Sequence, residues 1–247
     1  MKVSVILPTY NEAGNIVSLV ESILQHLPSD VEPEILIMDD NSPDETYSIA
    51  NKAFTGNSSI HVFLRTKDRG FAKSIRNGIE LATGEFIIVM DTDFTHNPVE
   101  IPKMLHIAQI YDIVSASRFA VGGNMQDRKH YLASLVYNWL LRIIIRTQVQ
   151  DNLGGYFAMK REKVLTLPFD KIFYGYGEYF FRLLYFAERR GFSIVEIPAL
   201  YLVRISGSSK SHFVKMLISY SFAAIRLKFK NCFPRKILKT PKYESND

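Results

Sequence analysis

Residues Phe86 to Met90 form an uninterrupted apolar run that leads directly into the acidic pair Asp91 and Asp93. A run without polar alternation is typical of a strand that is buried on both faces of a parallel sheet. In open α/β sheets, ligands bind beyond the carboxyl ends of the strands, so we expect both aspartates at a binding site. Their oxygens are suited to a divalent cation, which in turn can hold a diphosphate.

The residues before this run repeat a pattern of strand, loop and helix. We predict strands over 3–7, 34–39 and 60–64, and helices over 16–27, 45–54 and 71–82. Asn11 is the expected N-cap of the first helix. The alternation predicts an α/β fold with a mostly parallel sheet and helices on both faces. A second strand ends in Asp39 and Asp40, which strengthens the prediction of a binding site at this edge.

Two common phosphate-binding loops are absent from the sequence. The first strand is followed by Pro8-Thr-Tyr10-Asn-Glu12, where a dinucleotide site would have a glycine-rich fingerprint. No Gly-Lys-Ser/Thr motif of a P-loop is present either. Phosphate groups would therefore be held by a metal ion and by basic side chains.

The composition limits the classes of binding partner and the cellular compartment of the protein, but it does not identify one partner. A net charge of +5, from 30 Lys and Arg against 25 Asp and Glu, suits nucleic acid, an anionic membrane surface or a phosphorylated substrate. Cys232 is the single cysteine, which excludes a disulfide framework and suits a reducing compartment. We expect neither a secretory signal nor a transmembrane helix, because no apolar stretch approaches the roughly 20 residues that span a bilayer.

Three linked motifs resemble the family 2 glycosyltransferases of GT-A fold, and most closely their dolichol-phosphate mannose synthase branch. The motifs are Ile6-Leu-Pro-Thr-Tyr-Asn-Glu12, Met38-Asp-Asp-Asn-Ser-Pro-Asp44 and Met90-Asp-Thr-Asp93. The resemblance continues through Ser117-Arg-Phe119, Val121-Gly-Gly123, Asp151-Asn-Leu-Gly-Gly155 and Gly207-Ser-Ser-Lys210. It implies one GT-A domain over 1–210, which is a Rossmann-like three-layer sandwich with a mostly parallel mixed sheet.

The resemblance also implies how a nucleotide-sugar donor is held. The residues assigned to the donor are Pro8, Tyr10, Glu12, Asp40, Asp91, Arg204 and Lys210. Arg204 and Lys210 would contact the diphosphate, and Asp91 would lie nearer to the sugar. Asp93 would bind Mg²⁺ or Mn²⁺. Relatives commonly carry a glutamine where this chain has Thr95, so either the Thr95 hydroxyl or a water molecule takes that place around the metal.

The acceptor implied by the resemblance is a polyprenyl phosphate. Because a phosphate nucleophile is already an anion, it needs no general base, and cationic side chains must instead bring two phosphate groups together. Arg118 is the first candidate for this role. Arg128 is the second, with Lys129 and His130 as alternatives at the same place. We expect a single inverting displacement with no covalent enzyme intermediate.

Two segments are candidates for contact with a lipid. Residues 131–146 are apolar nearly all the way round, which predicts either a buried core helix or an interfacial helix with Trp139 at the headgroups. Residues 211–230 predict an amphipathic helix on a membrane surface, and 231–247 a flexible polar tail. We therefore expect peripheral attachment to the cytoplasmic face of a membrane, directly or through a small membrane-protein partner.

Together these features predict transfer of a hexose, mannose from GDP-mannose, to polyprenyl or dolichyl phosphate. The nearest alternative is transfer of glucose or an N-acetylhexosamine from a UDP-sugar to polyprenyl phosphate or to a glycan. A non-catalytic subunit of the same family is a further alternative. Nucleic acid is not an expected partner, because the acidic strand ends would repel its phosphates in the absence of a metal ion.

Overall fold

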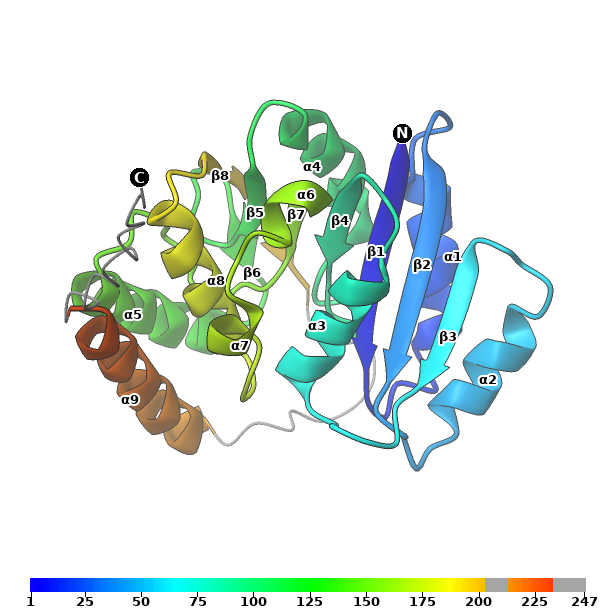
Figure 1. Ribbon diagram of the computed structural model, residues 1–247, viewed down its shortest axis with the longest axis horizontal. Coiled ribbons are helices and arrows are strands. Elements are labelled where there is room, and N and C mark those ends of the chain that lie inside the picture. Colours follow the sequence, from blue (N-terminus) through cyan, green and yellow to red (C-terminus); the bar gives the residue numbers. More distant parts are fainter. Residues whose placement is uncertain (203–212, 233–247) are drawn as a thin grey trace, which may run out of the picture.

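The computed structural model describes residues 1–202 and 213–232. Within them, a seven-stranded sheet has the order β3-β2-β1-β4-β7-β5-β8 (Figure 1). Its strands are β1 (Lys2–Thr9), β2 (Glu32–Asp39), β3 (Ile60–Leu64), β4 (Phe86–Val89), β5 (Ile113–Ser117), β7 (Phe157–Lys160) and β8 (Ile194–Pro198). Only β7 runs antiparallel to its neighbours β4 and β5. A short parallel pair joins β6 (Asn124–Met125) to β9 (Leu200–Tyr201). The mostly parallel mixed sheet that the sequence predicts is confirmed.

Helices cover both faces of this sheet (Figure 1). One core cluster packs α1 and α4 against one face, and a second packs α3, α7 and α8 against the other. The helices are α1 (Ile16–His26), α2 (Thr46–Ala53), α3 (Phe71–Leu81), η1 (Pro98–Glu100), α4 (Ile101–Ala108), α5 (Arg128–Ile145), α6 (Arg161–Val164), α7 (Phe169–Ile172), α8 (Tyr179–Glu188) and α9 (Phe213–Cys232). The arrangement is the three-layer sandwich expected from the sequence.

The side chains of β4 explain why its sequence shows no polar alternation. Phe86 and Ile88 belong to the cluster beneath α1 and α4. Ile87 and Val89 belong to the cluster beneath α3 and α8. Because successive side chains of a strand point to opposite faces, a strand with helices on both faces must be apolar at every position.

The carboxyl ends of four strands meet at one edge of the sheet. β1 is parallel to both β2 and β4. Two successive antiparallel pairings, of β4 with β7 and of β7 with β5, make β5 point the same way as β4. This edge lies at the bottom of Figure 1, and the segments that follow Thr9, Asp39, Val89 and Ser117 all leave from it.

The prediction that Asn11 is the N-cap of the first helix is wrong. The first helix begins at Ile16, and Asn15 takes the N-cap position. Asn11 adopts a left-handed backbone conformation, with φ of 58°, and its backbone amide donates to Ser42 Oγ at 2.9 Å. Asparagine tolerates this conformation better than most residues, so Asn11 turns the loop toward the end of β2 instead of starting the helix.

The two faces of α5 differ in burial, so a core position is confirmed for one face only, and contact of the other face with a membrane stays a prediction. Tyr137, Leu141 and Ile145 are buried in a third cluster against α8 and α9. The opposite face is exposed, including Val136 and Trp139. α5 and α9 pack directly together, and Tyr137 Oη donates to the Leu217 carbonyl at 3.0 Å. Throughout 1–202 and 213–232, no helix combines the length and apolar character needed to cross a membrane.

Glu34 is a buried carboxylate at the far end of the sheet, and we expect it to make stability depend on pH. It accepts hydrogen bonds from Ser4 Oγ and from the Thr83 amide, the latter at 2.8 Å, and Lys2 Nζ lies 3.6 Å away. Burial alone would raise the pKa of Glu34, but these hydrogen bonds and the lysine outweigh it and lower the pKa from 4.5 to about 2. The contribution to stability is therefore complete above about pH 4.5 and is lost as the pH falls toward 2.

Substitution Glu34→Gln should lower the free energy of unfolding at pH 7 by about 3 kcal/mol. The difference from the parent protein should shrink between pH 4.5 and pH 3, which urea denaturation at both pH values would measure. Glu32→Gln is the matched control, because Glu32 also lies beside Lys2, at 3.7 Å, but is exposed. An equal effect of the two substitutions would contradict the assignment to Glu34.

Candidate active site

The loop after β1 is fixed by hydrogen bonds to the loop after β2. The Glu12 amide donates to Thr46 Oγ1 at 3.0 Å, and the Ala13 amide donates to Asp44 Oδ2 at 3.0 Å. The pKa of Asp44 is lowered because hydrogen bonds from the Thr46 hydroxyl and from the Ala13 and Thr46 amides outweigh the effect of burial, which acts in the opposite direction. Tyr10 stands in this loop with 40% of its surface exposed. It is therefore an accessible aromatic surface at the sheet edge.

The adjacent carboxylates of Asp39 and Asp40 have different partners. Asp39 is fully buried and accepts from the Ser42 amide at 2.9 Å. Asp40 forms a buried ion pair with Arg65 Nη1 and accepts from the Gly70 amide at 2.6 Å. Both carboxylates thus hold loops in place at the carboxyl end of β2.

Asp91 and Asp93 follow β4 at the same edge. Asp93 is buried, and its Oδ1 accepts from both the amide and the hydroxyl of Thr95, at 3.1 and 2.6 Å. The side chain of Asp91 is 37% exposed. Thr92 Oγ1 donates to the Pro8 carbonyl at 3.4 Å, which joins this turn to the end of β1. The turn presents one accessible and one buried carboxylate to the site.

His96 is a buried residue that the sequence analysis did not identify as part of the site. Its Nδ1 accepts from the Asp91 amide at 2.9 Å. Its ring stacks on Tyr156 at 4.8 Å and meets the edge of Tyr201 at 4.8 Å. Burial lowers the pKa of His96 to about 4 and outweighs the opposing charge of Asp93. A neutral imidazole therefore connects the turn after β4 to the segment before β7.

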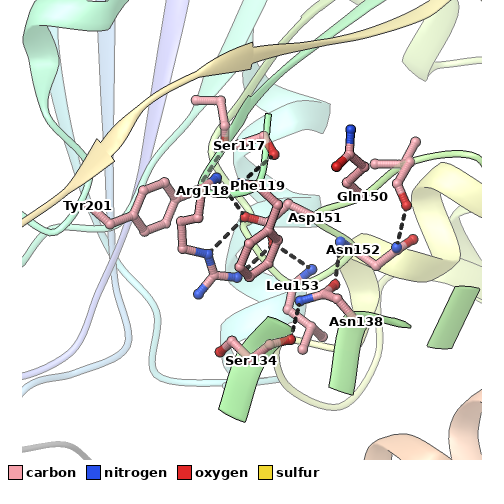
Figure 2. A network of polar contacts seen from close by, with 12 residues as sticks. Ser117, Arg118, Phe119, Ser134, Asn138, Gln150, Asp151, Asn152, Leu153 and Tyr201 are labelled. Atoms are coloured by element: carbon pink, nitrogen blue, oxygen red, sulfur yellow. Dashed lines mark hydrogen bonds and ion pairs between the residues drawn. The ribbon is translucent and has the colours of Figure 1, made fainter. Parts of the chain in front are cut away.

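Arg118 at the end of β5 is held by Asp151 in a bidentate ion pair (Figure 2). Nε donates to Oδ2 at 2.8 Å and Nη2 donates to Oδ1 at 2.6 Å. The guanidinium lies over the rings of Phe119 and Tyr201, at 5.2 and 5.0 Å. Burial alone would lower the pKa of Arg118, but the charge of Asp151 raises it above its ordinary value, with a further contribution from Asp91. Nη1 has no hydrogen-bond partner among the described residues.

The loop that carries Asp151 is tied to α5 and to β8. The Asn152 amide donates to Asn138 Oδ1 at 2.7 Å, and Asn138 Nδ2 donates to the Ser134 carbonyl at 2.9 Å (Figure 2). The Asp151 amide donates to Glu196 Oε1 at 2.9 Å. This network connects the position of Arg118 to the helix with the exposed apolar face.

An apolar groove of about 540 Å³ lies beside this network. It is lined by Phe119, Leu135, Val136, Asn138, Trp139, Arg142 and Gln150. Phe119 is the residue next to Arg118, and its ring lies 5.3 Å from that of Tyr131 in the first turns of α5. The groove therefore extends from the neighbourhood of a guanidinium along the exposed face of α5.

The structure brings most of the predicted site residues to one sheet edge. These are Pro8, Tyr10, Glu12, Asp40, Asp91, Asp93, Thr95 and Arg118. Arg128 is exposed at the first residue of α5, and no contact joins it to Arg118 among the described residues. Arg204 and Lys210 lie outside the described residues, so their roles stay predictions.

Sequence reasoning missed the partners that fix these residues. Asp151 was noted only within a motif, while Arg65, His96 and Glu196 were given no role. Arg118 and Asp151 are 33 positions apart in the sequence, and Asp40 and Arg65 are 25 apart. No local sequence signal links the members of these pairs, because they come together only when the strands are ordered in a sheet.

Comparison with known sequences identifies a family. The sequence-family model described as glycosyl transferase family 2 matches residues 4–167 of this chain. The chain is 32% identical over 217 residues to a dolichol-phosphate mannosyltransferase of Pyrococcus furiosus, covering 85% of this chain and 59% of that protein. It therefore spans less than two thirds of that relative's length. It is 30% identical over 215 residues to a polyprenol monophosphomannose synthase of Mycolicibacterium smegmatis, covering 83% of this chain and 79% of that protein.

Comparison with solved structures identifies a protein whose fold is similar to that of this chain. Glucosyl-3-phosphoglycerate synthase from Mycobacterium tuberculosis, in complex with Mn²⁺, UDP and glucosyl-3-phosphoglycerate, superimposes with a TM-score of 0.68. The sequence identity is 20%, and the match covers 94% of this chain and 80% of that chain. The same synthase has also been crystallised with Mg²⁺ and UDP, with a TM-score of 0.66. At this identity the likeness establishes the fold alone.

Proposed function

The chain belongs to glycosyl transferase family 2, and from this premise we propose that it transfers mannose from GDP-mannose to a polyprenyl phosphate. The observation that carries the proposal is the pairing of two kinds of site at one sheet edge. Carboxylates suited to a metal-bound diphosphate follow β4, and a guanidinium beside an apolar groove follows β5. The names of the relatives from Pyrococcus furiosus and Mycolicibacterium smegmatis support mannose and a polyprenol as the substrates.

The donor set at the end of β4 fits Mg²⁺ or Mn²⁺. Asp91 and Asp93 offer hard oxygen ligands, and no cluster of three or more acidic, histidine or cysteine ligands occurs among the described residues. Mg²⁺ is commonly bound in this way, by one or two carboxylates together with substrate phosphates and water. When bound, the metal would supply positive charge to the diphosphate leaving group. Asp93 would hold it, with Thr95 orienting the carboxylate or acting as a further ligand.

On the donor side, Tyr10, Glu12 and Asp40 would bind the nucleoside, and Asp91 would lie close to the sugar. Arg204 and Lys210 would contact the diphosphate. On the acceptor side, Arg118 would hold the lipid phosphate through Nη1, the nitrogen that Asp151 does not use. Arg128 would add positive charge from the start of α5. The phosphate oxygen would then attack the anomeric carbon of mannose while the bond from that carbon to the GDP oxygen breaks. GDP would leave, and this single displacement would invert the configuration of the anomeric carbon.

The exposed apolar faces of α5 and α9 support docking on a membrane surface. The exposed side chains are Leu132, Leu135, Val136, Trp139, Leu140 and Ile143 on α5 and Ile218, Phe222, Ile225 and Phe229 on α9. Neither helix contains an acidic residue, whereas both contain arginine and lysine. Such a face suits the interface of an anionic bilayer, with the apolar side chains inserted and the basic ones at the headgroups. The groove beside Arg118 would then open toward the lipid acceptor.

Substitution Phe222→Asp should weaken binding to anionic phospholipid vesicles by at least about tenfold, because burial of a phenylalanine contributes about 1.5–3 kcal/mol. The unfolding free energy should stay unchanged, since Phe222 is 70% exposed. Vesicle co-sedimentation over a series of lipid concentrations measures the effect. Ile110→Asp is the control, because Ile110 is 74% exposed at the end of α4. Equal losses in both variants would contradict docking through α9.

Product analysis tests the proposed reaction. The protein is incubated with GDP-mannose, Mn²⁺ and a short polyprenyl phosphate, and the lipid fraction is analysed by mass spectrometry and NMR. We expect a mannosyl-phosphoryl lipid with the β configuration, formed from the α-linked donor. An α-linked product would contradict the single displacement, and a free sugar with no lipid product would contradict the acceptor.

A further inference from the structure

Arg69 lies over an aromatic ring of the proposed donor site. Its Cζ is 5.5 Å from the centroid of the Tyr10 ring. Both side chains are exposed, but they come from different loops, which follow β3 and β1. The connection from β3 to α3 runs along the lower edge of the sheet in Figure 1. This loop, residues 65–70, is therefore the wall of the proposed donor site that faces Tyr10.

A buried ion pair fixes this wall. The Asp40 carboxylate pairs with Arg65 Nη1 at the start of the loop and accepts from the Gly70 amide at its end, at 2.6 Å. Arg65 Nη2 also donates to the Asp68 carbonyl at 2.8 Å. Gly70 has φ of +137°, a conformation that other residues rarely adopt. Asp40 thus closes the loop at both ends, and Arg69, directly before Gly70, is presented toward Tyr10.

We propose that Arg69 and Tyr10 hold the nucleobase of the donor between them, and that Arg69 is a specificity-determining residue that favours a purine. This inference rests on the proposed function. Arginine guanidinium planes and tyrosine rings both stack on bases. A base held between two such groups needs about 7 Å, which is twice a contact separation of about 3.5 Å. The present 5.5 Å widens to that distance by a small movement of an exposed, flexible side chain.

A guanidinium over a tyrosine face is attracted by the ring, which favours the contact between Arg69 and Tyr10. A purine offers a larger stacking surface than a pyrimidine to both partners. GDP should therefore gain more than UDP from Arg69, which agrees with a guanosine donor.

Nucleotide binding tests this assignment. The affinities of GDP and UDP in the presence of Mn²⁺ are measured by calorimetry for the parent protein and for Arg69→Met. This substitution roughly keeps the length of the side chain but removes its charge and its planar guanidinium group. We expect GDP binding to weaken about tenfold, and UDP binding to weaken less. Arg69→Lys, which restores the charge alone, should not recover the affinity. Lys67→Met, an exposed cation of the same loop, should bind both nucleotides as the parent protein does.

A second readout separates stacking from a structural effect. Tyr10→Leu and Arg69→Met should be non-additive in GDP affinity, because both remove support from the same base. In transfer assays Arg69→Met should raise the KM for the donor and leave kcat nearly unchanged. GDP affinity that is unaltered in Arg69→Met would overturn the inference, as would equal losses for GDP and UDP that Arg69→Lys restores. If the parent protein bound neither nucleotide, the proposed function would fail together with it.

Discussion

Substitution Asp93→Asn should reduce kcat by about a thousandfold, because it removes the buried negative charge that would hold the metal at the diphosphate. Asparagine keeps the shape of the side chain and one oxygen that can accept from Thr95, so the fold should be retained. Initial rates at saturating GDP-mannose and Mn²⁺ give kcat, and thermal unfolding verifies the fold. The affinity for Mn²⁺ in the presence of GDP should fall in parallel.

Asp170→Asn is the matched control for this experiment. Asp170 is an exposed carboxylate that pairs with Arg76 at 2.6 Å, far from the end of β4 in the sequence and on a different element. It should keep full activity. Thr95→Val adds a further distinction, since loss of Mn²⁺ affinity in this variant would assign the hydroxyl to the metal. An Asp93→Asn protein with more than a tenth of the parent kcat would contradict the metal assignment.

Substitution Arg118→Met should lower the free energy of unfolding by about 3–5 kcal/mol, because it leaves the Asp151 carboxylate buried without its partner. Asp151 is completely buried, and Arg118 is 7% exposed. Urea denaturation at pH 7 measures the loss. The double variant Arg118→Met with Asp151→Leu should lose clearly less than the sum of the two single variants, since no unpaired charge is left.

Arg76→Met is the control for the buried pair. Arg76 pairs with Glu80 at 2.8 Å and with Asp170 at 2.6 Å, but its side chain is 34% exposed. Exposed ion pairs contribute about 0–1 kcal/mol, so this variant should be only slightly less stable than the parent. A loss of less than 1 kcal/mol in Arg118→Met would show that the bidentate pair does not hold the loop.

The sequence predicts the first half of the scaffold well, because β1, β2, β3 and β4 each carry a local signal. The apolar run of β4 and the acidic residues after β2 and β4 indicate the sheet, and the linked motifs indicate the family; both are confirmed, while the role of this edge as the active site stays a prediction. The fold was also correctly expected as a mixed sheet. The reversed direction of β7, which aligns β5 with β4, has no local signal and follows only from the pairing of strands.

The site is predicted less completely, because its geometry depends on contacts between distant segments. Asp91 and Asp93 lie at the expected edge, but nothing in the sequence indicates that His96 would bind the Asp91 amide and stack on Tyr156. Arg118 is expected as a cation for the acceptor phosphate, and the sequence does not indicate that Asp151 uses two of its nitrogens. Asn11 is not a helix cap because α1 begins only at Ile16, and the Asn11 backbone amide instead donates to Ser42, from the loop after another strand.

A comparison of donors in a membrane-free assay tests the proposed transfer of mannose to a polyprenyl phosphate. Purified protein, Mn²⁺ and a short polyprenyl phosphate are combined with GDP-mannose, UDP-glucose or UDP-N-acetylglucosamine, and the rate of lipid-linked sugar formation is measured for each. We expect GDP-mannose to give the mannosyl-phosphoryl lipid, and omission of the metal to abolish the product. Formation of lipid-linked sugar from a UDP-sugar, with none from GDP-mannose, would contradict the proposal.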